Sequence, residues 1–236
     1  EKLAVEGCAA VDQVFPERLG HGRADNEAGG QTLPYDFEAD STQISADSDG
    51  YVQSIGGDVL MRLAAENDLV LRIAARPGAF VTQGACVMEA YPKARVSDEI
   101  DEDLRGAVVI GRDRTPYQDL EFAIRRIVEL AQRSLSPGIN DPKTAIICLD
   151  RLEALLSQAA RPPEQEEVPR HERLSLPALT FDTMLDRAMH SIARDAAPNV
   201  EVVLRQIAAL ERIGMAARSE LIRPALLNML GLTADY

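Results

Sequence analysis

The sequence predicts an α+β fold, in which a small β module at residues 41–95 precedes a mostly α-helical domain at residues 96–236. Between residues 41 and 92, short segments rich in β-branched residues alternate with Gly and Pro turns, a pattern typical of a small barrel or sandwich. After Pro92 the apolar residues recur at helical spacing. The chain has 236 residues, of which 46% are hydrophobic and 27% charged, so it can bury a real core.

Residues 1–40 have a different character from the rest of the chain. Ala4, Cys8, Val11 and Phe15 have helical spacing and predict a helix. The stretch from Gly20 to Asp40 is rich in Gly, Asp and Glu, which predicts a long, mobile loop. Because the chain begins without Met inside an apparent helix, we interpret it as a piece of a longer protein.

The β module is predicted from alternating segments and turn residues. Strands are expected at residues 42–46, 51–55, 69–73 and 85–90, with a short helix at 58–67. Asp49-Gly50, Pro77-Gly78 and Gln83-Gly84 are expected to be turns.

The Gly50-x-Val52 pattern and the segment from Arg76 to Gly84 resemble the barrel-sandwich hybrid of biotinyl and lipoyl carriers and of membrane-fusion adaptor proteins. A carrier needs a Lys at the tip of a hairpin, whereas Lys93 follows the last predicted strand. We therefore expect a barrel-sandwich-hybrid-like module with a structural or assembly role, and no cofactor.

The helical domain is predicted from a sequence of apolar stripes. The first helix, at residues 116–135, has its apolar stripe from Leu120 to Leu135, and a second helix runs to Ala159. A linker near residues 161–173 and a short strand at 174–176 follow. Thr180 is expected to cap the next helix, and a helical pair at residues 199–217 and 219–230 completes the chain.

The first helix of this domain also has a polar face. Its members are Gln118, Phe122, Arg125, Glu129 and Arg133, which recur every three or four residues. Ion pairs at i,i+4 on a solvated face would contribute only about 0.2–0.5 kcal/mol each. The alternative is an ordered polar seam that leads into the following turn, and the aromatic Phe122 favours some burial.

Ser136-Pro137-Gly138-Ile139-Asn140-Asp141-Pro142 interrupts the helical pattern. We expect Pro137 to end one helix, Gly138 to take the left-handed conformation, Asp141 to cap the next helix and Pro142 to begin it. Free helix amides beside Arg133 would suit an anion, although the Asp141 carboxylate would compete for them. The candidate ligand-binding residues are Arg114, Gln118, Asp119, Arg125, Glu129, Arg133, Ser136, Asn140 and Asp141.

Several classes of function are disfavoured by composition and motifs. A net charge of -13 argues against binding of nucleic acid and of anionic lipid surfaces. Cys8, Cys86 and Cys148 are expected to be free thiols, and His21, His171 and His190 form no metal-binding pattern. We predict no catalytic residues and no metal site, and lean against an enzyme.

The segment from Arg112 to Arg125, the motif Arg133-x-Leu135-Ser136-Pro137-Gly138-Ile139-Asn140-Asp141-Pro142 and the strand at Asp49-Gly50-Tyr51-Val52 resemble a family of predicted bacterial membrane proteins whose domain has no known function. The resemblance implies membrane helices N-terminal to this chain, with residues 1–40 membrane-proximal. It also implies residence in the bacterial inner membrane.

We therefore predict a non-enzymatic soluble domain of an integral membrane protein, acting in assembly, gating or sensing. We expect its partners to be its own N-terminal membrane helices and further copies in a homo-oligomer. Free cysteines favour a cytoplasmic location. The alternative is a small-ligand-binding or hydrolytic domain that uses the polar face of the 116–135 helix and the Ser136–Pro142 turn.

Overall fold

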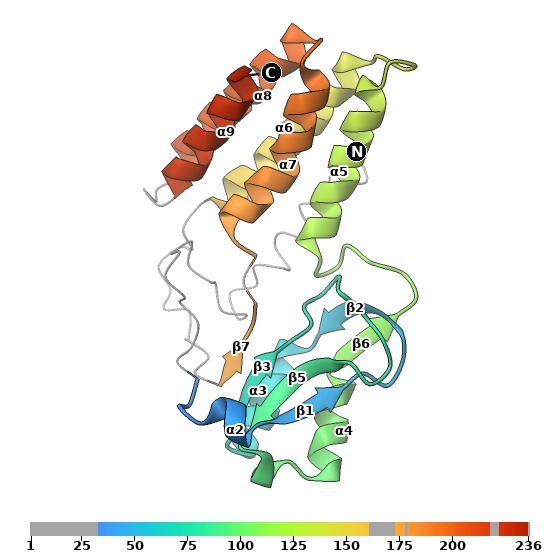
Figure 1. Cartoon of the computed structure of the whole chain (residues 1–236), viewed down its shortest axis with the longest axis vertical. Coiled ribbons are helices and arrows are strands. Elements are labelled where there is room, and N and C mark those ends of the chain that lie inside the picture. Colours follow the sequence, from blue (N-terminus) through green and yellow to red (C-terminus); the bar gives the residue numbers. More distant parts are fainter. Residues whose placement is uncertain (1–32, 161–172, 178, 218–221, 236) are drawn as a thin grey trace. The chain divides into compact units, whose positions relative to one another are not determined.

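A computed structural model describes residues 33–160, 173–177, 179–217 and 222–235 (Figure 1). Within this part, the chain divides into two compact units, each with its own core. The β unit contains residues 33–119 and 173–177, and the helical unit contains residues 120–160, 179–217 and 222–235. The prediction of an α+β fold is confirmed. The predicted N-terminal helix, most of the mobile loop and nearly all of the 161–173 linker lie outside the described residues.

The β unit contains two open sheets among its described residues. Their strands are β1 (Thr42–Ser45), β2 (Gly50–Ile55), β3 (Val70–Ile73), β4 (Phe80–Val81), β5 (Cys86–Tyr91), β6 (Val108–Gly111) and β7 (Leu174–Ser175). One sheet has the order β1-β5-β3-β7 and the other β4-β2-β6. All pairs are antiparallel except β3 with β7. Because the sheets are open, the predicted barrel-sandwich closure is not confirmed.

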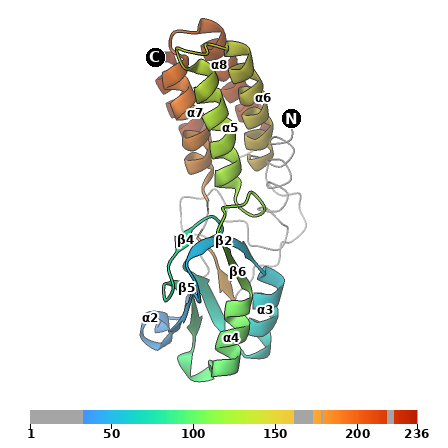
Figure 2. The same cartoon turned by 90° about the vertical axis from the view of Figure 1, so that its right-hand side faces the viewer.

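Short helices accompany these sheets: α2 (Phe37–Asp40), α3 (Gly57–Glu66), α4 (Asp98–Gly106) and the 3₁₀ turn η1 (Lys93–Arg95). Figure 2 shows α3 and α4 side by side. Ser97 caps α4, since its Oγ accepts a hydrogen bond from the Ile100 amide at 3.3 Å. Fully buried side chains join the helices to both sheets, and they include Ile44, Ile55, Leu60, Leu71, Met88 and Leu104.

The predicted β elements occur close to their expected positions, but the boundary of the helical domain does not. Residues 96–119, expected in the helical domain, lie in the β unit, where β6 pairs with β2 from Tyr51–Gly111 to Ile55–Val108. The run Val108-Val109-Ile110 is too short for periodicity to distinguish a strand from a buried helical turn. The next helix begins at Leu120 rather than at residue 116.

The helices of the helical unit are α5 (Leu120–Leu135), α6 (Pro142–Ala159), α7 (Phe181–Ala196), α8 (Val200–Ala216) and α9 (Arg223–Asp235). α5 packs on α6 and α7, α6 on α8, and α9 on α7 and α8. Thr180 caps α7 as predicted, because its Oγ1 accepts a hydrogen bond from the Thr183 amide at 3.3 Å. The predicted last helix begins and ends later than expected.

Polar contacts join the helices of this unit. Arg205 on α8 donates to Asp150 Oδ1 at 2.8 Å and to Glu153 Oε2 at 2.6 Å on α6. Gln132 on α5 donates to Asp195 on α7 at 2.7 Å. Gln206 is fully buried, and its Nε2 donates to the Met189 carbonyl and to Thr233 Oγ1, so it links α8 to α7 and α9. These contacts give the bundle a specific register in addition to its apolar core.

The described cysteines are free, as predicted. Cys148 is buried in α6, and desolvation raises the pKa of its thiol to about 11. Cys86 is half-buried in β5, where burial also raises the pKa of the thiol. Neither environment activates a thiolate nucleophile, since activation requires a lowered pKa.

Candidate functional site

The nine predicted ligand-binding residues fall into two groups. Arg114, Gln118 and Asp119 lie in the β unit, within residues 112–119, which we call the connector because it joins β6 to α5. The other six lie in the helical unit: Arg125, Glu129, Arg133, Ser136, Asn140 and Asp141. Each group is therefore a separate candidate.

A buried ion pair closes the connector on itself. Arg114 Nε donates to Asp119 Oδ2 at 2.5 Å, and Arg114 Nη2 donates to Asp119 Oδ1 at 3.1 Å. This two-point geometry is the strong form of an arginine–carboxylate contact. Only 3% of Asp119 is exposed, and 17% of the Arg114 side chain is. The pair is thus withdrawn from solvent and fixes the course of the connector.

The loop between β3 and β4 lies directly over this pair. Gly78 has φ +87°, and a Cβ built on it would lie 2.0 Å from Asp119 Oδ2. The Gly78 amide donates to the Val52 carbonyl at 2.7 Å, and the Val52 amide donates to the Ala79 carbonyl at 2.9 Å. Pro77-Gly78 is therefore a turn, as predicted, and it is a glycine turn because the Asp119 carboxylate occupies the space that a side chain would need.

Gln118 and Gln53 attach the connector to β2. Gln118 Oε1 accepts from the Ile55 amide at 2.9 Å, and Gln118 Nε2 donates to the Ile55 carbonyl at 3.3 Å. Gln53 Nε2 donates to the Asp113 carbonyl at 2.7 Å. The Gln118 side chain thus pairs with a strand backbone as a neighbouring strand would. Gln118 is not part of the α5 face on which it was expected, because α5 begins two residues later.

The remaining charged residues of the α5 polar face are solvated. Arg125, Glu129 and Arg133 are exposed, whereas Phe122 is half-buried. The Arg126 guanidinium lies 5.6 Å from the centre of the Phe122 ring, which is cation–π distance. The partial burial expected for Phe122 is therefore present, and part of its cover comes from Arg126, which was not counted in the seam.

The Ser136–Pro142 turn is held by its own hydrogen bonds. Ser136 Oγ donates to the Arg133 carbonyl at 2.7 Å, the Asn140 amide donates to the Ser136 carbonyl at 2.9 Å, and the Asp141 amide donates to the Ser134 carbonyl at 2.8 Å. Asn140, with φ +45°, takes the left-handed conformation that we expected at Gly138. Asn tolerates this conformation better than other residues with side chains. The expectation for Gly138 is therefore wrong.

Asp141 caps α6 as predicted. Its Oδ1 accepts from the Thr144 amide at 3.2 Å, and its Oδ2 accepts from Thr144 Oγ1 at 2.6 Å. These hydrogen bonds, the one from the Thr144 side chain first, lower the pKa of the Asp141 carboxyl. An anion that sought the α6 amides would have to displace this carboxylate.

Replacing Asp141 with Ala is expected to lower the thermal unfolding midpoint of the helical unit at neutral pH. A carboxyl with a lowered folded pKa binds fewer protons when folded, so its stabilisation is present above the unfolded pKa of about 3.9 and is lost as pH falls through the folded value. The difference between the variant and the parent protein should therefore shrink in acid. Circular dichroism melts across a pH series measure it, with Asp141→Asn as a control that keeps a capping oxygen without its charge. A difference that is constant with pH would contradict the assignment.

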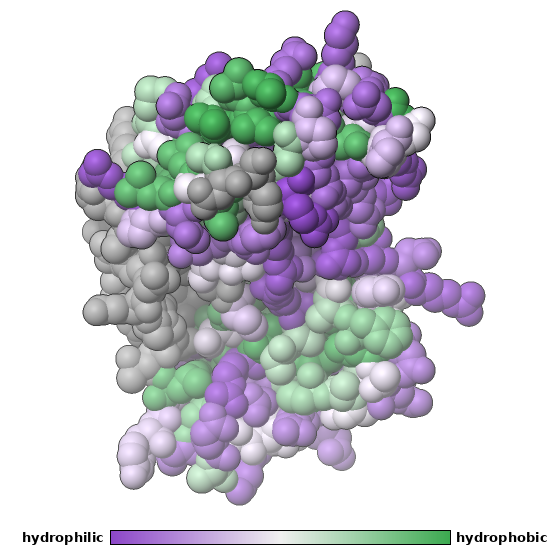
Figure 3. Space-filling model, turned by 45° about the horizontal axis from the view of Figure 1, so that its top comes forward, coloured by the Kyte–Doolittle hydropathy of each residue, from purple (hydrophilic) through white to green (hydrophobic). Residues whose placement is uncertain are grey.

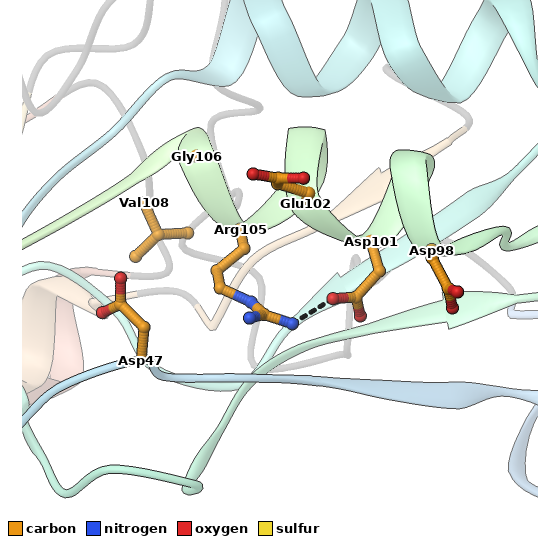
Figure 4. A pocket seen from close by; sticks show the side chains of 7 residues that line it. All are labelled: Asp47, Asp98, Asp101, Glu102, Arg105, Gly106 and Val108. Carbon is orange, nitrogen blue, oxygen red and sulfur yellow. Dashed lines mark hydrogen bonds and ion pairs between the residues drawn. The ribbon is translucent and has the colours of Figure 1, made fainter.

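The structure also contains an open hollow of about 560 Å³ that sequence reasoning missed (Figure 4). Its lining residues are Asp47, Asp98, Asp101, Glu102, Arg105, Gly106 and Val108. Arg105 pairs with Asp101 one turn earlier on α4. The acidic run from Asp98 to Asp103 was the available signal, but such a run is usually a solvated face. Among the described residues, no three His, Cys, Asp or Glu side chains are placed to hold a metal ion.

The fold and these contacts together define a class of protein. It is a two-unit α+β protein in which the connector is anchored to the β unit and the helical unit contains the Ser136–Pro142 turn. No helix in the described part of the chain combines the length and apolarity that a membrane crossing requires. A family model described as "Predicted membrane protein (DUF2254)" matches residues 6–212. The chain belongs to this family, which confirms the resemblance found in the sequence.

Two mycobacterial proteins are similar to this chain. The chain is similar to the uncharacterized protein Rv1290c of Mycobacterium tuberculosis (strain ATCC 25618 / H37Rv) and to the uncharacterized protein Mb1321c of Mycobacterium bovis, each 31% identical over 204 residues. Each match covers 82% of this chain and 38% of the relative, so the chain spans well under half the length of these relatives. No solved structure matches the chain.

Proposed function

We propose that this chain is a non-enzymatic extramembrane domain of an integral membrane protein, and that it acts in assembly. Membership of a family of predicted membrane proteins supports its place in an integral membrane protein. Assembly, gating and sensing are all compatible with such a domain. The surface of the helical unit favours assembly.

The observation that carries this proposal is the exposure of large aliphatic side chains along one side of α8. Val200 is 69% exposed, Leu204 61% and Met215 77%. Single exposed hydrophobic residues are ordinary, but several on one face of one helix are typical of an interaction surface. Figure 3 shows hydrophobic residues in green exposed among hydrophilic ones in purple.

The proposed partners are membrane helices elsewhere in the longer protein and further copies of the chain. We place the protein in the bacterial inner membrane, with this domain on the cytoplasmic side. The free thiols of Cys86 and Cys148 support that side, because reducing compartments preserve them.

Size-exclusion chromatography with light scattering over a wide range of protein concentration tests the proposal. The expected result is a mass that rises with concentration to a multiple of the mass of one chain. A mass equal to one chain at every concentration would overturn the assembly role.

A further inference from the structure

One side of α8 faces outward, with exposed residues toward both ends and the half-buried Ala208 between them. Its central positions are 200, 204, 208, 211 and 215, which recur every three or four residues and so lie on one face. The opposite side of the helix holds the buried residues Val202, Gln206, Ala209, Leu210 and Ile213. We call the five outward positions the α8 outer face. Four of its five residues are apolar, and Glu211 is the exception.

We infer that the α8 outer face is the contact between two copies of this chain, with their α8 helices antiparallel about a two-fold axis near Ala208. The inference rests on the proposed assembly function and names the partner. A two-fold axis places each residue of one helix opposite its counterpart counted from the other end. Val200 then lies near Met215 of the second copy, and Ala208 lies opposite itself, where its small side chain permits close approach.

Charge complementarity selects the antiparallel arrangement. Glu201 and Arg212 lie on the same edge of the α8 outer face, near its two ends, and both are exposed. In an antiparallel pair, Glu201 lies about 4.5 Å along the axis from Arg212 of the second copy, because three residues of helix separate their levels. In a parallel pair, the two-fold axis runs along the helices and places this edge on opposite sides of the two copies, so Glu201 and Arg212 would both lie away from their counterparts. The antiparallel pair therefore gains an attraction that the parallel pair lacks.

Glu211 should weaken this contact rather than strengthen it. Within the antiparallel pair it lies near the level of Leu204 of the second copy, so association removes its carboxylate from water beside an apolar side chain. This costs free energy, because a carboxylate loses hydration without gaining a partner. Glu211→Leu should therefore strengthen association, whereas the same change would be neutral if the α8 outer face stayed in solvent.

The first test compares two charge insertions at equally exposed leucines. Leu204→Glu places a carboxylate within the α8 outer face, and Leu227→Glu places one on α9, where Leu227 is 60% exposed. Sedimentation equilibrium of the full 236-residue chain should show a dissociation constant raised at least about tenfold for Leu204→Glu and unchanged for Leu227→Glu. Both positions are exposed, so circular dichroism should show intact helical units.

The second test is a charge exchange. Glu201→Arg and Arg212→Glu should each raise the dissociation constant, and the combined variant should restore it. Arg212 also contacts Glu153 of its own chain at 3.3 Å, so thermal melts of the Arg212→Glu variant separate folding from association. A failure of the combined variant to restore association would overturn the antiparallel arrangement.

The same experiments distinguish association through the α8 outer face from association through another surface. An oligomer that is indifferent to Leu204→Glu would leave the assembly role standing and overturn the assignment to α8. A strictly monomeric chain would overturn both. If deletion of residues 1–15 from such a monomer removed the protection of the α8 amides from hydrogen exchange, that segment would cover the α8 outer face in place of a second copy.

Discussion

Gly78→Ala is expected to lower the free energy of unfolding of the β unit by about 2–5 kcal/mol. Two costs add at this position. The φ of +87° belongs to a region that residues with side chains avoid. The new Cβ would also lie 2.0 Å from Asp119 Oδ2, an oxygen that the ion pair with Arg114 prevents from moving aside.

Gly84→Ala is the matched control, because it places a side chain at a positive φ without bringing the new Cβ into a clash. Gly84 has φ +83°, but nothing lies within 4 Å of a Cβ built on it. Its replacement should cost only about 1–2 kcal/mol. Urea unfolding measures both variants, and hydrogen exchange at the Val52 amide assigns the loss to the β unit. Equal losses for the two variants would show that Asp119 moves away freely, contrary to the geometry.

Asp119→Ala is expected to cost about 3 kcal/mol, because it removes the carboxylate that forms a two-point pair with the largely buried Arg114 guanidinium. Arg114 would keep its guanidinium largely buried with its two-point partner gone. The loss should appear in urea unfolding and as faster exchange of the Ile55 amide, which bonds to Gln118 in the adjacent part of the connector.

Two further variants sharpen this result. In Glu38→Ala the lost carboxylate is 76% exposed and its partner Arg72 retains Glu89, so the loss should be much smaller. Arg114→Met combined with Asp119→Leu should cost less than the two single losses added together, since no charge is left unpaired. Strict additivity would show that the two side chains do not stabilise the connector as a pair.

Together these expectations give the connector a structural role. Among the predicted ligand-binding residues, Gln118 attaches the connector to β2, and Arg114 pairs with Asp119 immediately before α5 begins. In the helical unit, the Asp141 carboxylate caps α6, and Ser136 bonds back to the end of α5. The polar residues that the sequence singled out therefore include those that define where helices start and stop.

Local chemistry made much of the fold predictable. The cap and first-turn pattern Asp141-Pro142 sets the start of α6, and the apolar stripe of α5 sets its buried side. The sequence also predicted the glycine turns at residues 78 and 84, and both glycines have positive φ. The start of α5 was not predictable from the sequence. Residues 116–119 suit a helix locally, but contacts of Gln118 and Asp119 with distant segments keep these residues outside the helix.

The sequence by itself determined the fold class, the family and the positions of most strands, helices and caps, because these depend on periodicity and on contacts between near neighbours. Only the tertiary structure decided that 96–119 belongs to the β unit, that Gly78 lies against Asp119, and that the aliphatic side chains at 200, 204 and 215 of α8 are exposed. Each of these depends on residues far apart in the chain, and a local pattern carries no information about which of its apolar residues a distant segment covers.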